Sequence, residues 1–370
     1  SGLKAFTVPA KVISIGKDAF SGTSKMTSIN VETGNEFYAA DKGVLYNSDY
    51  TEIITVPGGL TNVEIREGIT DIGTFFQNNT SVDRLALPNS ITGLSSQAFA
   101  NATRLREVVL GTGIVSTANA CFMGCTSLKK VIFTASGEIT LARRTFMDDT
   151  ALESIVFLGD VKKLTTSALA ASATVRQQTV FANLQPKSVS LLFEGDVSEL
   201  ELEDNELGAN EAGNTQYLNG DVVKAVYVKD LSAVSQNLRA WCECAEGLKR
   251  SADKDSDFSK TLGVIQVVTV GAAAEGLISK TFIDDAFSLQ AIASGNGALS
   301  YASSNEDIAT VDEDGTVVIN GVGETTITVM AAEAEGYSSC DVAVTLLVGK
   351  GIIVKPVGKV LTYNATEQIG

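Results

Sequence analysis

The chain combines 370 residues with a formal net charge of −16 at pH 7, so it can hold two or three domains and is too acidic to favour nucleic acid or anionic membrane as a partner. It contains no histidine, which removes the usual general base near neutral pH, Ser-His-Asp and Cys-His catalysis, and the commonest zinc ligand. No apolar stretch is long enough for a transmembrane helix, and the first residues lack a signal-peptide pattern.

The first half of the chain is a repeat of about 23 residues. Its phenylalanines are Phe76, Phe99, Phe122 and Phe146, spaced 23, 23 and 24 residues apart. Apolar residues follow each of them at offsets +6, +9 and +11, as in Leu105, Val108 and Leu110. One such unit cannot bury its own apolar face, so units must stack into a solenoid, with each +9/+11 pair on a short strand and each phenylalanine in a turn or short helix.

We expect residues 1–262 to form this solenoid, and residues 1–250 to be one right- or left-handed coil with a single parallel sheet. The array begins in mid-repeat with Leu3, Phe6 and Val8, which predicts further sequence upstream. An insertion from about residue 35 to about residue 68 separates the unit that starts at Phe20 from the one that starts near Phe76. Two β-rich runs around Asn47-Ser48-Asp49 predict a hairpin that projects from the coil.

The repeat degrades after Val161, where Ala168-Leu169 resembles one unit and Val180–Phe193 another. The acidic run 199–214 predicts a surface loop. A strand is expected at Val222–Val228, and an amphipathic helix at about 230–248, N-capped by Asp230, that carries the only tryptophan. Such a helix at the end of an array is expected to cap its last apolar layer.

Three aspartates, Asp253, Asp255 and Asp257, suggest a calcium loop. Phe258 stands where that loop needs glycine and Val264 where it needs glutamate, so a polar linker is the better interpretation. The five cysteines, Cys121, Cys125, Cys242, Cys244 and Cys340, lack paired metal-ligand spacing. We expect mostly unpaired thiols, and no metal or other cofactor.

The pattern changes again after about Thr261, and residues 263–349 predict a β-sandwich. The expected strands are Phe282–Ala291, Leu299–Tyr301, Ala309–Val311, Thr316–Ile319, Thr325–Ala331 and Asp341–Val348, with a hairpin turn at 312–315. Residues 350–370 begin another strand pattern and predict the start of a further, truncated module. The fold class is thus mainly β with short helical turns: a leucine-rich-repeat solenoid plus an Ig-like sandwich.

The units resemble the BspA-like leucine-rich repeat family of bacterial surface proteins. The resemblance covers about residues 1–250 and rests on Ala98-Phe99-Ala100-Asn101, Cys121–Leu128 and the inserted Asp41–Asn47. Residues 300–330 are similar to a bacterial Ig-like domain of the group 2 type. These resemblances imply an exported protein at the bacterial cell surface, with an adhesive front module on Ig-like spacers, and they name no ligand.

Three functions remain open. One is a surface binding or adhesion module that takes a host or matrix protein, or a glycan. The second is a structural stalk whose binding function lies elsewhere in a longer protein. The third, an enzyme, would need a carboxylate pair in a cleft, and no such constellation is recognisable. We expect a non-enzymatic protein and a monomer.

The binding surface is expected on the strands, because residues at +8 and +10 must point out of the sheet if +9 and +11 point in. The candidate ligand-binding residues are Arg84, Ala86, Glu107, Val109, Lys130, Ile132 and Val156. They form an apolar +10 row beside a polar +8 row. Simple β-propensity, or coverage by the hairpin around Tyr46, would also explain an apolar stripe.

Overall fold

The computed structural model describes residues 2–16, 19–20, 23–166, 180–181, 183–185, 187–203, 222–243 and 260–350. The chain divides into two compact units, residues 1–265 with 335–338, and residues 266–334 with 339–370. The domain boundaries inferred from the sequence stay a prediction, since a division by contacts does not show that residues 263–349 fold alone.

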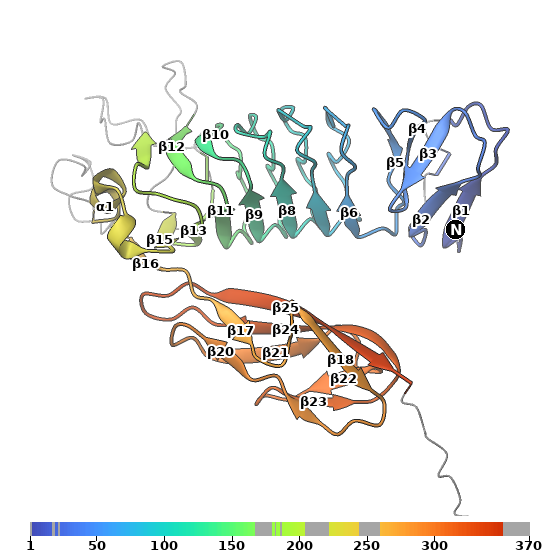
Figure 1. The fold of residues 1–370 in the computed structure, drawn as a ribbon. Helices are drawn as coiled ribbons and strands as arrows, with labels where there is room; N and C mark the ends of the chain where they lie inside the picture. The colour runs from blue at the N-terminus through green and yellow to red at the C-terminus, as the bar shows by residue number, and fades with distance from the viewer. Residues whose placement is uncertain are drawn as a thin grey trace, which may run out of the picture. The chain divides into compact units, whose positions relative to one another are not determined.

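An eight-stranded parallel sheet runs through the first unit (Figure 1). Its strands in order of sequence are β6 (Asn62–Glu64), β7 (Arg84–Ala86), β8 (Glu107–Leu110), β9 (Lys130–Phe133), β11 (Ser154–Phe157), β13 (Val189–Phe193), β15 (Val223–Val228) and β16 (Thr261–Val264). Neighbours along the array are in register, so Val108 stands between Leu85 and Val131. All three side chains are buried in one core, as the in-phase apolar residues predict.

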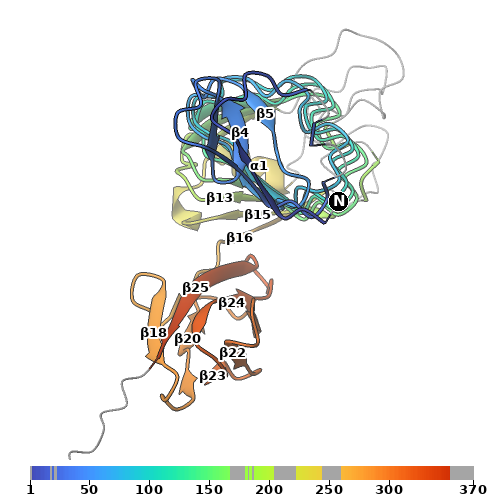
Figure 2. The ribbon, with the colours of Figure 1, turned by 90° about the vertical axis from the view of Figure 1, so that its right-hand side faces the viewer.

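The repeating phenylalanines stack on one another inside the coil. Phe99 lies 5.8 Å from Phe76 and 4.8 Å from Phe122 between ring centroids, and the last two rings are almost parallel. Each phenylalanine lies in a turn that bonds to the next coil, as where Phe99 N–H donates to the Cys121 carbonyl at 2.9 Å. Viewed along the array, successive coils superimpose around this core, which is the arrangement of a solenoid (Figure 2).

The expectation of a single parallel sheet is wrong. A second parallel sheet of three strands is formed by β10 (Gly137–Leu141), β12 (Val161–Thr166) and β14 (Glu201–Glu203). Ile139 and Leu164 are in register and buried, so the second sheet contributes its own row of inward-facing apolar side chains to the coil. β14 also lies within the acidic run that was expected to be a loop, because Leu202 is buried beside Leu164.

The degenerate stretch adds one strand to the main sheet where two units were expected. β13 pairs directly with β11, and Phe193 stacks on Phe157 at 4.7 Å. A strand from the unit expected at Ala168-Leu169 therefore does not enter between them. Those two residues lie outside the described part of the chain.

The insertion is a three-stranded antiparallel sheet, β3 (Tyr38–Asp41), β4 (Val44–Asn47) and β5 (Ile53–Thr55). It follows a separate parallel pair, β1 (Ala5–Val8) and β2 (Ser28–Val31). The expected hairpin of β4 and β5 is present, but it does not project from the coil. Val44 and Tyr46 are fully buried in the main core, because the insertion carries that core across the gap between β2 and β6.

The expected long helix is broken into two pieces. Asp230 caps a short 3₁₀-helix, Leu231–Ala233, by accepting a hydrogen bond from Ser232 N–H, and Val234 is extended. The α-helix α1 (Gln236–Glu243) begins after Ser235, whose hydroxyl accepts from Leu238 N–H at 3.1 Å. The helix buries Trp241 in the main core, but β16 follows it as a further strand, so α1 is not the last element of the array.

The second unit is an Ig-like sandwich with its own core. One sheet has the order β18-β25-β24-β21 and another has the order β19-β23-β22, with a small sheet β17-β20 beside them. The strands are β17 (Val268–Val270), β18 (Leu277–Thr281), β19 (Phe287–Ser288), β20 (Ala291–Ala293), β21 (Leu299–Ser303), β22 (Ala309–Val311), β23 (Thr316–Ile319), β24 (Gly323–Ala331) and β25 (Cys340–Gly349). The 312–315 turn joins β22 to β23 as predicted, whereas the strand expected at 282–291 is divided between β19 and β20.

Other sequence expectations fall on residues that the structure does not describe: the aspartates from Asp253 to Asp257, Cys244, and nearly all of the tail 350–370. In the described ranges, no disulfide joins any two of the cysteines Cys121, Cys125, Cys242 and Cys340. No helix in those ranges has the length and hydropathy to cross a membrane.

Candidate functional site

The outward face of the eight-stranded sheet places the candidate residues in two rows. The strand register aligns Ala86, Val109, Ile132 and Val156 in one row and Arg84, Glu107, Lys130 and Ser154 in the other. The buried residues between them, such as Val108, anchor each strand to the core. The structure therefore brings the seven candidate residues to one face of this sheet, whereas Ser28 and Asn30, which the same alternation placed in these rows, lie on β2 of a separate sheet.

The apolar row is partly exposed over its first three strands. Ala86, Val109 and Ile132 have intermediate exposure, whereas Val156 is only 5% exposed. The row continues in register to Leu192 on β13, which is also half-exposed. The accessible part is therefore centred on Val109 and Ile132, and Val156 contributes little surface.

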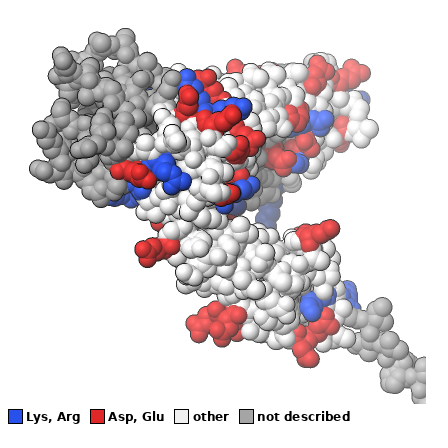
Figure 3. Space-filling model, turned by 60° about the vertical axis from the view of Figure 1, so that its left-hand side comes forward, with Lys and Arg blue, Asp and Glu red and all other residues white. Residues whose placement is uncertain are grey.

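The polar row is tied together between coils. Arg84 lies 3.7 Å from the Glu107 carboxylate, and on the adjoining turns Arg106 and Lys129 face Asp83 and Glu153 at 3.3 and 2.8 Å. Each pair links one coil to the next. Acidic and basic side chains accordingly interleave over this unit (Figure 3). Exposed pairs of this kind stabilise weakly, by about 0–1 kcal/mol each, and remain available to a ligand.

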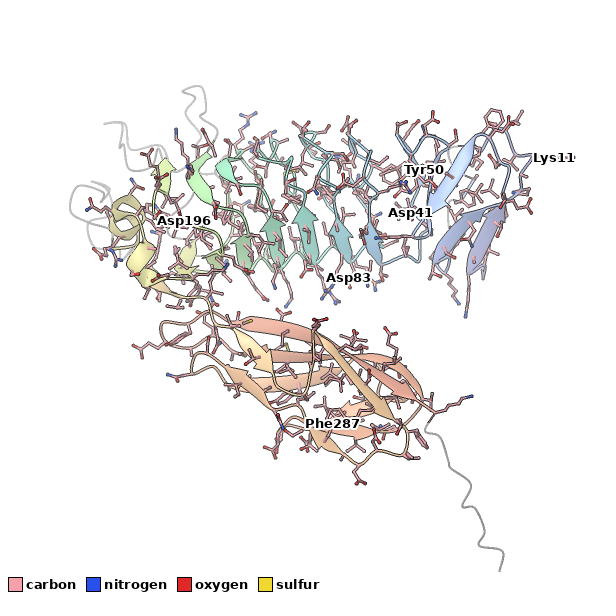
Figure 4. All side chains as sticks on the ribbon, viewed as in Figure 1. Lys11, Asp41, Tyr50, Asp83, Asp196 and Phe287 are labelled. Atoms are coloured by element: carbon pink, nitrogen blue, oxygen red, sulfur yellow. The ribbon has the colours of Figure 1, made fainter. Side chains whose placement is uncertain are left out.

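A cavity of about 400 Å³ adjoins the start of the apolar row. It is lined by the β3–β4 turn and by the ends of β6 and β7, namely Asp41, Lys42, Glu64–Glu67 and Ala86–Asn89. Figure 4 shows Asp41 and Tyr50 where the insertion meets β6. Apart from Ala86, no sequence pattern indicated this site, because its walls come from segments whose approach depends on how the insertion packs.

The charged groups of the cavity neutralise one another in part. Lys42 pairs with Glu64, and the Arg66 guanidinium lies 3.9 Å from Asp41 and 3.9 Å above the centre of the Tyr50 ring. Hydrogen bonds from Asn89 N–H and then Ser90 N–H lower the pKa of Glu67. The lowered pKa keeps Glu67 ionised, and together these contacts give a polar site of defined shape.

Asp149 and Cys121 are buried titratable groups that line neither the outward face nor the cavity. Asp149 Oδ1 accepts from Cys125 N–H at 2.8 Å, and burial raises the pKa of Asp149 well above its usual value. Burial likewise raises the pKa of Cys121 to about 12, so this thiol stays protonated and unreactive at neutral pH. Within the described ranges, no group of three or more His, Cys, Asp or Glu side chains could hold a metal ion.

Two protein families match parts of this chain. Residues 1–64 and 57–176 match the BspA type leucine rich repeat region, in six copies, and residues 288–333 match the immunoglobulin-like domain of intimin. The chain therefore carries BspA-type leucine-rich repeats followed by an Ig-like domain. The assignment of that domain to the group 2 type stays a prediction. No curated protein sequence matches the chain.

Three solved structures are similar to parts of the chain. The pneumococcal vaccine antigen PcpA is 19% identical, with 71% of this chain and 56% of that chain covered and a TM-score of 0.40. A leucine-rich repeat protein from Eubacterium ventriosum is 19% identical over 47% of this chain and 62% of its own, with a TM-score of 0.32. A leucine rich cell surface protein from Faecalibacterium prausnitzii is 24% identical over 45% of this chain and 49% of its own, with a TM-score of 0.33. The chain thus spans about half to three fifths of these structures' own lengths.

Proposed function

We propose that this chain is a non-enzymatic binding module of a protein at the bacterial cell surface. Its ligand would be a host or matrix protein, or a glycan, held on the outward face of the parallel sheet, with the Ig-like unit as a spacer. The presence of BspA-type repeats and an Ig-like domain in one acidic chain supports an extracellular location. The observation that carries the proposal is the half-exposed apolar row beside an ion-paired polar row.

This arrangement suits recognition because an apolar strip gains free energy when water leaves it, while charged neighbours set orientation and partner choice. Val109 and Ile132 stand next to each other on β8 and β9, so one ligand group can cover both. The inward-facing side chains of β8 and β9 are packed in the core, so this face is rigid and loses little conformational entropy on binding.

The test is the double substitution Val109→Thr and Ile132→Thr, with binding measured against immobilised host matrix proteins and glycans. Threonine keeps the β-branched shape and strand preference, so the fold should be retained while the strip becomes polar. We expect affinity for a ligand of the array to fall at least about tenfold, which corresponds to about 1.4 kcal/mol.

Val318→Thr is the matched control, because Val318 is an exposed strand valine in the second unit. It should leave binding unchanged. If the double variant binds as tightly as the wild type, the outward face is not the binding surface. If no member of the panel binds the wild type, the structural stalk is the better interpretation.

A further inference from the structure

The parallel sheet of the first unit is interrupted between β2 and β6. β2 pairs only with β1, and β6 is the end strand of the eight-stranded sheet (Figure 1). The far edge of β2 is closed by the insertion, since Ile29 N–H donates to the Gly43 carbonyl at 2.9 Å. The insertion reaches the corresponding edge of β6 only beyond its last residue, where Arg66 N–H donates to the Tyr46 hydroxyl at 3.3 Å.

The backbone of β6 shows which groups this edge presents. Two hydrogen bonds identify the residues whose backbone groups face β7: Thr61 C=O accepts from Arg84 N–H, and Ile65 N–H donates to Ala86 C=O. Alternate residues of a strand direct their N–H and C=O to opposite sides, so Asn62 and Glu64 face away from β7. In the described part of the chain, no strand pairs with that edge.

The cavity lies beside this edge. Glu64, Ile65 and Arg66 form one wall, and Asp41 and Lys42 of the β3–β4 turn form another. Its volume of about 400 Å³ lies within the range of about 300–1,000 Å³ that is usual for ligand sites. A site for an added strand needs an unpaired strand edge with open space and buried apolar residues beside it. The edge of β6 has the cavity next to it, and the buried side chains of Ile65 and Leu87 line that cavity.

The charges indicate the chemistry of the occupant. Asp41, Glu64 and Glu67 outnumber Lys42 and Arg66 in the lining, and the whole chain carries −16. The acidic side chain of Glu64 points to the outward face, where it is exposed. A cationic side chain on an added strand would lie beside Glu64 and compete with Lys42, its present ion-pair partner, as opposite charges attract on paired strands.

We propose that the edge of β6 binds an extended, lysine-containing peptide segment of another protein by strand addition. The segment would pair its backbone with Asn62 and Glu64 and place its cationic side chains on the outward face. This site does not include Val109 or Ile132, so the proposal of a peptide site can be correct or wrong independently of the proposed function.

The test uses the full chain and a heptapeptide of alternating threonine and lysine, blocked at both ends. Two derivatives carry N-methyl groups, one on every threonine and the other on every lysine. An added strand bonds to β6 with only one of these two sets of N–H groups, so one derivative should bind at least about tenfold more weakly and the other should not. Charge attraction alone would weaken neither derivative or both equally.

A pair of variants tests the protein side. Glu64→Ala and Glu64→Pro both remove the Lys42 ion pair, but only the proline removes the edge-facing N–H. Proline is tolerated at such an edge because the bonds to β7 come from Thr61, Val63 and Ile65. We expect Glu64→Pro to bind the heptapeptide at least about tenfold more weakly than Glu64→Ala, with thermal unfolding of the two variants compared as a check on the fold.

Three results would overturn the proposal: no binding of the unmodified heptapeptide, equal binding of both N-methylated derivatives, or equal binding of the two Glu64 variants. The peptide comparison does not depend on either variant being folded. The strip variant Val109→Thr with Ile132→Thr should keep its affinity for the heptapeptide, which separates this site from the Val109–Ile132 strip.

Discussion

Replacing Phe99 by alanine is expected to destabilise the repeat array strongly. Phe99 has 0% exposure and stacks on a phenylalanine of the coil before it and one of the coil after it, at 5.8 and 4.8 Å. A buried phenylalanine covers roughly 200 Å² of apolar surface, which at about 25 cal/mol per Å² is about 5 kcal/mol as an upper bound. Measured truncations of this kind cost about 3–5 kcal/mol, and two lost ring contacts place Phe99 near the top of that range.

Two further variants separate the contributions. Phe99→Leu keeps most of the apolar volume and loses the stacking, so it should cost about 1–2 kcal/mol. Phe75→Ala is the control, because Phe75 is 39% exposed and its ring meets that of Phe76 in a T-shaped contact, so about 1 kcal/mol is expected.

The assay is urea unfolding of the full chain, followed by tryptophan fluorescence and far-UV circular dichroism. The only tryptophan, Trp241, lies in the core of the array, so its emission reports on the first unit without a signal from the second. Coincidence of the two transitions would justify a two-state treatment. If Phe99→Ala costs no more than Phe75→Ala, the stacked phenylalanines do not carry the stability assigned to them.

Three other perturbations have a defined direction. Burial raises the pKa of Asp149, so the protonated side chain stabilises the fold below the unfolded-state pKa of about 4, and this stabilisation is lost as the pH rises through the folded-state pKa. The free energy of unfolding of the wild type should therefore fall relative to that of Asp149→Asn over this pH rise, and a constant difference between the two would contradict the reasoning. Gly195→Ala should cost about 1–3 kcal/mol in urea unfolding, since a Cβ there would collide with the Gly159 carbonyl, whereas Gly93→Ala, with open space around it, should be near neutral. Cys340 is the only described cysteine that is not fully buried, so a thiol reagent should modify it before Cys121, Cys125 and Cys242 in the native protein, and earlier labelling of those three would refute the packing.

The periodic parts of the fold could be predicted because their information is local. The spacing from Leu85 to Val108 repeats along the array, and each repeat needs only to stack on its neighbour in the same register. The turn at Asp312–Gly315 is local as well, since the Asp312 carboxylate accepts from Asp314 N–H within the turn and from Thr316 N–H just after it. Both features follow from a few residues close together in the sequence.

The features that the sequence did not show depend on contacts between distant segments. The second parallel sheet needs Ile139, Leu164 and Leu202 to face one core, and no common spacing links them. Tyr46 belongs to a hairpin that could project or pack, and only its burial against the first coils decides which. The long helix breaks at Val234 although the apolar spacing continues through it.

Of the two candidate sites, one follows from local sequence and the other depends on contacts between distant segments. Strand alternation was enough to place Val109 and Ile132 on one face, although whether a ligand uses that face stays a prediction. The cavity beside β6 could not be found from the sequence. Arg66 stacks on Tyr50 and faces Asp41 only because the insertion returns to the array at that point.

The charges around the β6 edge have a second physical explanation, and the two can be separated. An open strand edge invites pairing with another copy of the chain, and charged side chains such as Lys42 and Glu64 are a common protection against it. If protection is their only role, Lys42→Ala with Glu64→Ala should self-associate in sedimentation velocity, and the wild type should not bind the heptapeptide. If the edge is a peptide site, the wild type should bind the heptapeptide as a monomer, and the heptapeptide should suppress any self-association of the double variant, because both processes compete for the N–H and C=O groups of Asn62 and Glu64. Self-association that the heptapeptide leaves unchanged would place the two processes on different surfaces and would leave the edge with a protective role alone.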